Sequence, residues 1–496
     1  MNQAPNRFYF SASEEMVSMA RNRLFHAPTV GTGGRTAQSA SSATAPSRAT
    51  GHRGTKVDWD RLRQRMRGAL LRPGDPGFED ARKLFNPLND DHIPVAVAQC
   101  ESTSDVSEAV RAAANCVPLA ARSGGHSYVG YSAPHGGLAL DLRRMSAVEV
   151  QADGAATIGA GAPLREVYSR VAQANRSLPA GSCFTVGIAG VTLGGGIGVL
   201  QRRFGLTCDH LVAAEMVTAD GRTLTASAAR TPDLFWALRG GGGGNFGIVT
   251  QLTFATDPAP ALTVFVVGFP PGKVPEVLSA WQPWISAAPR ELWANCNISG
   301  GDVPSCRVAG CFVGPSSSCH PLLDDLISRS GVLPSRRTVQ DREYFSAMRF
   351  FSGRPERESF VASSRVLSDH VSSPDALASL LVGRPGVSII LDPLGGAVQD
   401  VGIEQTAFPH RKAFATAQIY ASATAASEAE VTRSVRDIVA GLASLGIGGG
   451  YVNYIDPALP DWARAYYGPN LERLRSVAHD YDPDEVFDFP QGLTRA

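Results

Sequence analysis

Apolar and polar positions alternate in short blocks through the first half of the chain, between Pro94 and Phe254. The runs IPVAVAQC (93–100) and VPLAAR (117–122) are short and apolar, which is typical of buried strands. Between them, STSDVSEAVRAAANC (102–116) begins with hydroxyl side chains and has an acidic residue in its first turn, which predicts a helix. The alternation predicts an α+β fold, with an α/β layout as the alternative, built around ligand-facing loops.

A second pattern covers residues 257–447, where longer apolar runs are interleaved with amphipathic stretches. We expect strands such as LTVFVVGF (262–269) and VSIILDPLGG (387–396), and helices such as EVLSAWQPWISAA (276–288). This pattern predicts an antiparallel sheet with helices on one face. The tail from Tyr451 onward is dense in aromatic residues, and we expect it to fold back on the first half and line a shared cleft.

The length and the charge balance of the chain limit the number of domains and the classes of binding partner that we expect. A chain of 496 residues is too long for one ordinary core, so two or more domains are expected. Lys and Arg total 46, as do Asp and Glu, so the charge balance gives no reason to expect binding to nucleic acid or to an anionic membrane. The basic run at 59–74 is explained by a solvated helix face. No apolar run approaches the roughly 20 residues that a membrane helix needs.

The N-terminus and the cysteines bear on location. Residues 28–55 contain almost no large apolar side chains, so residues 1–56 are predicted to be a flexible lead-in. No uninterrupted apolar segment marks a signal peptide, so a cytoplasmic location is expected without excluding secretion. The eight cysteines form no CxxC pair, so no metal site is predicted. Cys306, Cys311 and Cys319 could form a disulfide in an oxidising compartment, but free thiols are favoured.

Glycine-rich loops carry the candidate chemistry. Ser123–Gly125 leads into a single histidine, His126, and residues 181–200 carry a lone cysteine, Cys183. A third glycine run lies at 240–244. Any one such loop is equally well explained as a tight turn, but several of them favour backbone that presses against a large ligand. One nucleophilic side chain in each of the first two loops suggests a cofactor that is covalently tethered twice.

Four segments then carry a family resemblance. They are RSGGHSYVGYS (122–132), GSCFTVGIAGVTLGGGIGVLQRRFGLTCDHL (181–211), DLFWALRGGGGGNFGIVT (233–250) and the tail segment at 451–483, YVNYID…YYGPNLERLRSVAHDYDP. They resemble the berberine-bridge-enzyme-like flavoproteins, a branch of the vanillyl-alcohol-oxidase superfamily with the PCMH-type FAD-binding fold.

The resemblance runs from about Val57 to Leu493 and implies a domain plan. An FAD-binding domain would be built from residues 57–256 and 448–496. A substrate-binding domain, residues 257–447, would be inserted between them.

The resemblance also implies FAD held by two covalent bonds, one from His126 to the flavin 8α-methyl and one from Cys183 to flavin C6. The alternatives are a turn histidine that only bonds backbone and a buried, inert cysteine. The sequence departs from the family at Phe184, where proline is usual, and at Val191, where many members carry histidine. Val186 matches the position at which the family gates the access of oxygen to the flavin. A small side chain at this position resembles the members that are oxidases and use O2.

Backbone amides of the turn that ends at His126 are expected to hold the FAD pyrophosphate, and Gly190, Gly194 and Gly195 to allow close approach of the second loop. The GAGA stretch at 159–162 is not a Rossmann fingerprint, because no strand–turn–helix unit with the downstream acid follows it. The expected cofactor-binding residues are His126, Cys183, Arg122, Ser123, Gly124, Gly125, Ser127, Val186, Gly187, Gly190, Gly194, Gly195, Gly247, Ile248, Val249, Tyr451 and Asn453.

For catalysis, the resemblance points to Tyr454 as the base and to Tyr420 as a partner in the same cleft. A tyrosine needs activation to act as a base at neutral pH, because its ordinary pKa is about 10. The alternative for either tyrosine is a core or rim residue. Some members use an acid on the strand that here carries Gln418 and Tyr420, and neither of those positions is acidic. The FPHR residues His410 and Arg411 are interpreted as structural.

The expected function is an FAD-dependent oxidase that removes hydride from an alcohol or hemiacetal carbon of a small-molecule natural product and reduces O2 to H2O2. The Ala-, Gly- and Arg-rich composition suggests a bacterial source, where such proteins tailor secondary metabolites. A carbohydrate oxidase that forms a lactone is the alternative among enzymes. A non-redox cyclase or binding scaffold that contains FAD is the alternative of another class. The partners expected are the substrate and O2, in a monomer or homodimer.

Overall fold

The first predicted strands form and pair within one small sheet. The computed structural model describes residues 56–496, so the predicted lead-in lies, apart from Lys56, outside the described residues. In this sheet the order is β1-β2-β4-β3, with β2 and β3 both parallel to β4 and β1 antiparallel to β2. Its strands are β1 (Leu70–Leu71), β2 (Ala96–Gln99), β3 (Leu119–Arg122) and β4 (Leu138–Asp141). The predicted helix becomes α4 (Thr103–Ala113), whose N-cap Ser102 accepts a hydrogen bond from the backbone N–H of Asp105 at 3.2 Å.

A second sheet completes the first half of the molecule. Its order is β5-β6-β10-β8-β9, and all its pairs are antiparallel. Its strands are β5 (Val148–Val150), β6 (Ala155–Gly159), β8 (Leu211–Val217), β9 (Thr223–Ser227) and β10 (Ile248–Ala255). Helices α5 (Leu164–Gln173) and α8 (Pro232–Ala237) also belong to this half, while β7 (Arg176–Ser177) and β11 (Asp257–Pro258) pair with each other as the chain leaves for the second half.

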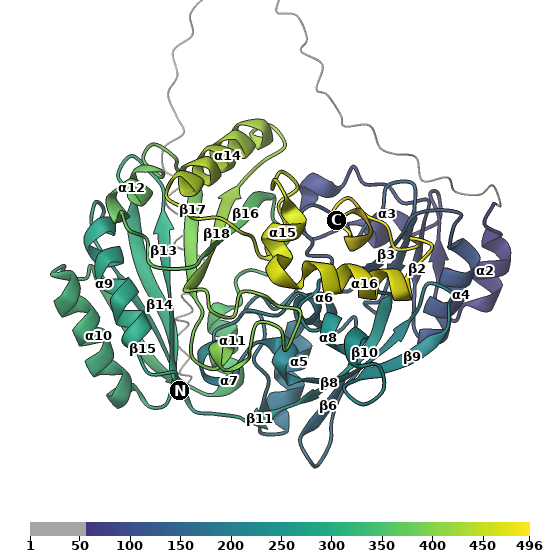
Figure 1. Cartoon of the computed structure of the whole chain (residues 1–496), viewed down its shortest axis with the longest axis horizontal. Coiled ribbons are helices and arrows are strands. Elements are labelled where there is room, and N and C mark those ends of the chain that lie inside the picture. Colours follow the sequence, from purple (N-terminus) through teal and green to yellow (C-terminus); the bar gives the residue numbers. More distant parts are fainter. Residues whose placement is uncertain (1–55) are drawn as a thin grey trace, which may run out of the picture.

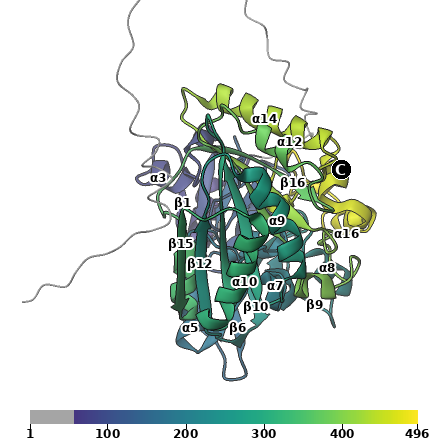
Figure 2. The ribbon, with the colours of Figure 1, turned by 90° about the vertical axis from the view of Figure 1, so that its left-hand side faces the viewer.

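The second half is an antiparallel sheet in the order β15-β12-β14-β13-β17-β18-β16, as the pattern at 257–447 predicts. The strands are β12 (Leu262–Gly268), β13 (Leu292–Ser299), β14 (Ser305–Val313), β15 (Arg336–Arg342), β16 (Phe360–Leu367), β17 (Val387–Pro393) and β18 (Ala415–Ser422). Helices cover its outer face (Figures 1 and 2), namely α9 (Val274–Ala287), α10 (Ser316–Ser330), α12 (Pro374–Ser379) and α14 (Glu428–Ser444). The predicted α+β fold is confirmed.

Side-chain alternation gives this sheet two different faces. Along β13, Leu292, Ala294, Cys296 and Ile298 belong to the core between the sheet and its outer helices. Because successive side chains of a strand point to opposite faces, the residues between them face the other way, toward the first half of the molecule. The inner face therefore carries polar side chains, which include Asn295.

The aromatic tail returns to the first half, as expected from its composition. It crosses between the two halves as α15 (Trp462–Tyr467) and α16 (Leu471–Tyr481), coloured yellow in Figure 1. Buried Tyr466 and Tyr467 belong to the same core cluster as the two sheets of the first half. Near the chain end, Leu493 N donates to Asn245 Oδ1 at 2.9 Å. The domain boundaries at 256 and 447 stay a prediction.

Shorter elements complete the described chain. They are α2 (Trp59–Arg65), α3 (Phe78–Arg82), η1 (Pro87–Asn89), α6 (Ile188–Leu193), α7 (Gln201–Phe204), η2 (Thr207–His210), α11 (Tyr344–Phe351), α13 (Ala397–Asp400), η3 (Val452–Tyr454), η4 (Gly468–Asn470) and η5 (Leu493–Arg495).

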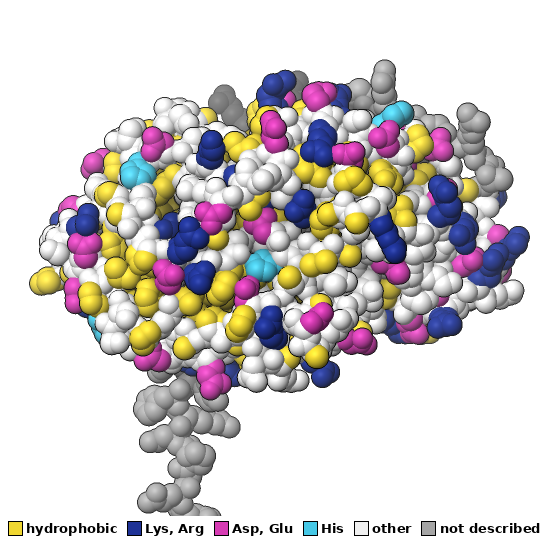
Figure 3. All heavy atoms as spheres, turned by 60° about the horizontal axis from the view of Figure 1, so that its bottom comes forward, with side chains coloured by type: hydrophobic (Ala, Val, Ile, Leu, Met, Phe, Trp, Pro, Cys, Tyr) yellow, Lys and Arg dark blue, Asp and Glu magenta, His cyan; other side chains and the backbone are white. Residues whose placement is uncertain are grey.

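The surface charges, the helices and the cysteines bear on membrane, metal and disulfide features of the described residues. Charges of both signs are interspersed over the face shown in Figure 3, in keeping with the balanced composition. Within residues 56–496 no helix is long and apolar enough to cross a membrane, and no group of side chains could hold a metal ion. Cys306, Cys311 and Cys319 are buried free thiols and form no disulfide, as expected.

Candidate functional site

The two loops that carry the candidate nucleophiles are packed backbone against backbone. A Cβ on Gly124 would overlap Gly187 N and lie 2.8 Å from Thr185 O, and a Cβ on Gly187 would lie 2.7 Å from Ser123 Cβ. Only glycine fits at either position without displacing a loop. Ser123 Oγ also donates to Ala160 O at 2.5 Å. The turn that follows β3 is thereby fixed against the segment that carries Cys183.

The Cys183 loop is in turn anchored on the first turn of α5. The N–H groups of Leu164 and Arg165 donate to the carbonyls of Val186 and Phe184, both at 2.9 Å. The first N–H groups of a helix have no partner within the helix, so this loop satisfies them. The ring of Phe184 stacks on Phe345 of α11, with centroids 5.7 Å apart. The phenylalanine that stands where the family usually has proline therefore contacts the second half of the molecule.

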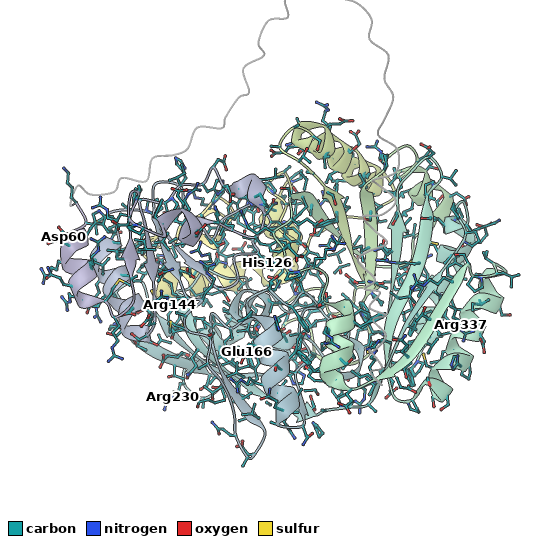
Figure 4. The ribbon with its side chains drawn as sticks, turned by 180° about the vertical axis from the view of Figure 1, so that it is seen from behind. Asp60, His126, Arg144, Glu166, Arg230 and Arg337 are labelled. Atoms are coloured by element: carbon teal, nitrogen blue, oxygen red, sulfur yellow. The ribbon has the colours of Figure 1, made fainter. Side chains whose placement is uncertain are left out.

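The structure brings His126 and Cys183 to one wall, where they share a single hydroxyl. His126 Nε2 lies 2.9 Å from Thr185 Oγ1, and Cys183 Sγ lies 3.4 Å from the same oxygen. The imidazole stacks on Phe85, with centroids 3.9 Å apart. Burial lowers the pKa of His126 to about 4, so its imidazole is neutral and nucleophilic at pH 7. Figure 4 shows His126 near the middle of the molecule, between the halves marked by Asp60 and Arg337.

Both nucleophiles line a cavity of about 1600 Å³. This exceeds the range of about 300–1,000 Å³ that is usual for one drug-sized ligand. A Cβ on Gly190 would meet nothing, so the wall is open there, and Gly125 and Gly247 adopt positive φ angles of 73° and 143°. A cavity of this volume, with glycine-rich walls and two nucleophiles, fits an FAD molecule. The expected cofactor residues that line it are His126, Cys183, Ser123, Gly124, Gly125, Ser127, Val186, Gly187, Gly190, Gly247, Ile248, Val249, Tyr451 and Asn453.

Three expected cofactor residues have other neighbours. Arg122 is fully buried, donates to Asp141 Oδ2 at 2.9 Å and does not line the cavity. A Cβ on Gly194 would lie 2.7 Å from Asn453 Nδ2, and one on Gly195 would lie 2.8 Å from the Phe408 ring. A glycine in the sequence indicates that another group approaches the backbone closely, but it does not show which group. For Gly194 and Gly195 that group is a protein side chain. None of these three residues lines the cavity.

The tail is tied to the glycine-rich loop through Tyr451 and Asn453. The Tyr451 hydroxyl accepts from Gly196 N at 3.0 Å and from Asn453 Nδ2 at 2.9 Å. Asn453 Nδ2 also donates to Val191 O at 3.0 Å. Burial raises the pKa of Tyr451 to about 12. The YxNY segment therefore holds the loop in place and presents Tyr454 next to it.

Aromatic rings line the part of the cavity that faces β18. Tyr454 and Tyr420 both lie there, and Tyr128 stacks parallel to Tyr454 with centroids 5.6 Å apart. Phe360 stacks on Tyr420 at 4.9 Å and meets Tyr128 edge-on at 5.1 Å. Gln418 Nε2 donates to the Tyr128 hydroxyl. The two expected tyrosines thus belong to one aromatic wall, to which Tyr128, not among the expected site residues, also contributes.

A buried carboxyl stands behind this wall, and sequence reasoning missed it. Asp392 on β17 is 8% exposed, and Asn295 Nδ2 donates to its Oδ1 at 3.4 Å. Burial raises the pKa of Asp392 to about 7. The pKa of Tyr454 is raised by burial and, next, by the charge of Asp392. The pairing of Asp392 with Thr416, two residues from Gln418, puts this carboxyl on the inner face, and that register cannot be read from the sequence.

Comparison with known proteins agrees with this geometry. Residues 94–227 match the family model described as an FAD binding domain, and residues 450–494 match the one described as berberine and berberine like. The chain is 36% identical over 445 residues to the uncharacterized FAD-linked oxidoreductase YgaK of Bacillus subtilis, covering 86% of this chain and 97% of that one. It is 30% identical over 434 residues to a chitooligosaccharide oxidase of Gibberella zeae, covering 81% and 87%.

Solved structures of relatives superpose over most of the chain. The berberine-bridge-enzyme-like protein 1 of Physcomitrella patens gives a TM-score of 0.82 at 26% identity, covering 88% of this chain and 99% of that one. The glucooligosaccharide oxidase of Acremonium strictum gives 0.80 at 28% identity, covering 89% and 100%. The chain therefore belongs to the berberine-bridge-enzyme-like family and is an FAD-dependent oxidoreductase.

Proposed function

We propose that this protein is an oxidase whose FAD is bonded to both His126 and Cys183. The observation that carries the proposal is the meeting of the two side chains on one cavity wall, both within hydrogen-bonding distance of Thr185 Oγ1. The Acremonium strictum glucooligosaccharide oxidase, 28% identical, is described as containing a 6-S-cysteinyl, 8α-N1-histidyl FAD. When bound, FAD accepts a hydride from the substrate carbon and passes two electrons on to an acceptor.

We assign removal of the substrate hydroxyl proton to Tyr454, and Asp392 accepts the proton that Tyr454 gives up. Because burial raises the pKa of Tyr454, this side chain does not stand as a free tyrosinate at neutral pH. Asp392, with a pKa of about 7, is the nearby group that is partly ionised there. Tyr454 takes the hydroxyl proton while its own proton goes to the Asp392 carboxylate, and the substrate carbon becomes a carbonyl. Tyr420 lies further along the aromatic wall, where it stacks on Phe360, and we assign it to substrate positioning.

We assign O2 as the electron acceptor and H2O2 as the product. Val186 supports this assignment, because it lines the cavity in the Cys183 loop and its side chain is small. The aromatic wall with Gln418 favours a substrate that offers a flat apolar face and hydroxyl groups. A natural product, such as a polyketide or glycoside, meets that description.

A second candidate is an oligosaccharide oxidase that forms a lactone. It is favoured by relatives named chitooligosaccharide oxidase and glucooligosaccharide oxidase, which are 30% and 31% identical to this chain. Sugar rings also have flat apolar faces that stack on aromatic side chains. The hemiacetal carbon of a reducing end bears the hydroxyl group that the proposed proton transfer requires.

Release of H2O2 from parallel panels of oligosaccharides and hydroxylated aromatic natural products tests the proposal. Substrate-dependent H2O2, with bleaching of the flavin absorbance when O2 is removed, is the expected result. The panel that responds identifies the substrate class. Bound FAD with no bleaching and no O2 uptake on any compound would instead indicate a non-redox scaffold.

A further inference from the structure

The hydroxyl of Thr185 connects the two candidate tethers, although it does not reach the cavity itself. His126 and Cys183 line the cavity, whereas Thr185 is not among the lining residues. Its Oγ1 lies 2.9 Å from His126 Nε2 and 3.4 Å from Cys183 Sγ. A hydroxyl has one proton to donate and two lone pairs to accept with. Its single proton can therefore serve only one of its two neighbours at a time.

The direction of that donation determines which atoms can attack. If Thr185 donates to His126 Nε2, the proton of the neutral imidazole must stand on Nδ1, and Nδ1 cannot act as a nucleophile. If Thr185 donates to Cys183 Sγ, its oxygen accepts the Nε2–H of His126, and Nδ1 keeps a free lone pair. Only the second arrangement leaves Nδ1 unprotonated and supplies a hydrogen bond to a thiolate at the same time.

Two further features favour the second arrangement. A hydrogen bond to an ionised acceptor is roughly twice as strong as one between neutral groups, so a thiolate attracts the hydroxyl proton more strongly than an imidazole nitrogen does. The stacking of His126 on Phe85 and the packing of Gly124 against Gly187 hold the ring and the two loops in place. The hydroxyl therefore meets both partners without rearrangement.

We infer that Thr185 is a positioning residue for flavin attachment, whose hydroxyl holds His126 in the tautomer with a free Nδ1 while it stabilises the thiolate of Cys183. This inference rests on the proposed covalent attachment of FAD. His126 Nδ1 forms a bond to the 8α carbon, and one proton from that carbon and one from Nε2 leave with two electrons. Cys183 Sγ, once its thiol proton has left, forms a bond to C6, which loses its hydrogen as a proton, so this attachment likewise gives up two protons and two electrons. In each case O2 takes up two electrons and two protons and becomes H2O2.

Variants that separate the hydroxyl from the shape of the side chain test the inference. Thr185→Val keeps the shape and removes the hydroxyl, Thr185→Ser keeps the hydroxyl, and Thr185→Ala gives a second hydroxyl-free variant should the valine variant not fold. Thr192→Val is a matched control, because the Thr192 Oγ1 donates at 2.7 Å to Ile188 O within its own helix, α6, and forms no hydrogen bond with His126 or Cys183. Protein made under riboflavin limitation is mixed with FAD in air, and peptide masses give the rate of attachment at each residue.

We expect Thr185→Val to slow attachment at both residues by about tenfold, the factor that one lost hydrogen bond to a charged group corresponds to. Thr185→Ser and Thr192→Val should attach FAD at close to the wild-type rate. Noncovalent FAD affinity, measured by fluorescence quenching, should be similar in all variants. Wild-type attachment rates in Thr185→Val, or a serine variant as slow as the valine variant, would overturn the inference.

A double-mutant cycle gives a readout that a purely structural role would not produce. In Cys183→Ala the sulfur acceptor is gone, so Thr185 is free to donate to His126 Nε2 and attachment at His126 should already be slow. Adding Thr185→Val should then cause little further loss, and a full additive loss would contradict the shared proton. Wild-type protein that carries no covalent flavin at all would instead reject the proposed function itself.

Discussion

At the scale of single residues, the site places a tyrosine and a carboxyl where neither ionises easily. Burial raises the pKa of Tyr454, and it raises the pKa of Asp392 to about 7. The charge of Asp392 also disfavours ionisation of Tyr454, since it is the second cause of the raised Tyr454 pKa. At neutral pH Tyr454 therefore keeps its proton, and the Asp392 carboxyl is only partly ionised. Such a pair can take one proton from a substrate at neutral pH.

Replacing Tyr454 by Phe removes the hydroxyl that we assign to the substrate proton. General bases contribute about 10²–10⁴-fold to rate, so we expect the rate of flavin reduction to fall by a factor in that range. Anaerobic stopped-flow absorbance measures this rate. The covalent flavin content should stay at the wild-type level, which separates lost chemistry from a damaged site. An unchanged reduction rate would show that Tyr454 is not the base.

Replacing Asp392 by Asn tests the carboxyl in the pH profile. Because the base must be ionised and its pKa is about 7, kcat/KM of the wild type should rise with pH through about 7 and then level off. Asp392→Asn should be slower and should lack this rise. A variant that keeps the wild-type profile would assign the titration to another group.

The same substitution, Asp392→Asn, should increase the stability of the folded state although it slows the reaction. A carboxyl whose pKa rises from 3.8 to about 7 on folding destabilises the folded state when it is ionised, by about 4 kcal/mol above pH 7 at 1.36 kcal/mol per pKa unit. This penalty is absent below pH 4 and develops as the pH rises to 7. Asp392→Asn should therefore raise Tm at pH 8 and leave it nearly unchanged at pH 4, in thermal unfolding followed by circular dichroism. A higher Tm at both values would point to a packing effect.

The sequence indicates some of these residues and hides others for a physical reason. His126 and Cys183 stand out because each is the one nucleophile in a glycine-rich loop. In the sequence Thr185 is an ordinary loop residue, and its contact with His126 is seen only in the folded structure. Asp392 stands on the inner face of the sheet, where its charge acts on Tyr454, because of the register of β17 on β18, which depends on contacts far apart in the chain.

At the scale of elements, the contact between two loops fixes the geometry of the site. Gly124 and Gly187 let the backbones of the His126 turn and the Cys183 loop touch, and α5 anchors the second loop through its first N–H groups. The strands and helices around these loops follow from hydrophobic periodicity and could be predicted. The group that each glycine lies against could not be predicted: a Cβ on Gly194 would approach Asn453, and one on Gly195 would approach Phe408.

A methyl group at position 187 should push the two loops apart. The Cβ of Gly187→Ala would lie 2.7 Å from Ser123 Cβ, and overpacking of this kind destabilises proteins by about 1–3 kcal/mol. We expect a lower Tm and a reduced fraction of covalently bound flavin. Gly448→Ala is the matched control, because a Cβ there meets nothing within 4 Å. Full flavin content in Gly187→Ala would mean that the loop contact does not position the tethers.

At the scale of the whole molecule, the cavity is assembled from parts that are distant in sequence. Its walls come from the His126 and Cys183 loops, from β18 of the inserted sheet and from the returning tail. A ligand that fills this space contacts all of them, so its binding should stabilise the whole fold by mass action.

Removing both tethers should make this stabilisation depend on the concentration of free FAD. For His126→Ala with Cys183→Ala, FAD at 100 times its Kd should add about 2.7 kcal/mol to the free energy of unfolding. Its Tm should rise as FAD is titrated, whereas the Tm of the wild type should not respond. Thermal unfolding over a series of FAD concentrations measures both. A wild-type Tm that also rises with added FAD would indicate an exchangeable cofactor.

Acid precipitation followed by peptic digestion and mass spectrometry tests the central claim most directly. Two covalent bonds predict that the flavin stays with the precipitated protein and that its mass is found on peptides containing His126 and Cys183. Flavin released free into the supernatant would contradict both bonds and leave only noncovalently bound FAD.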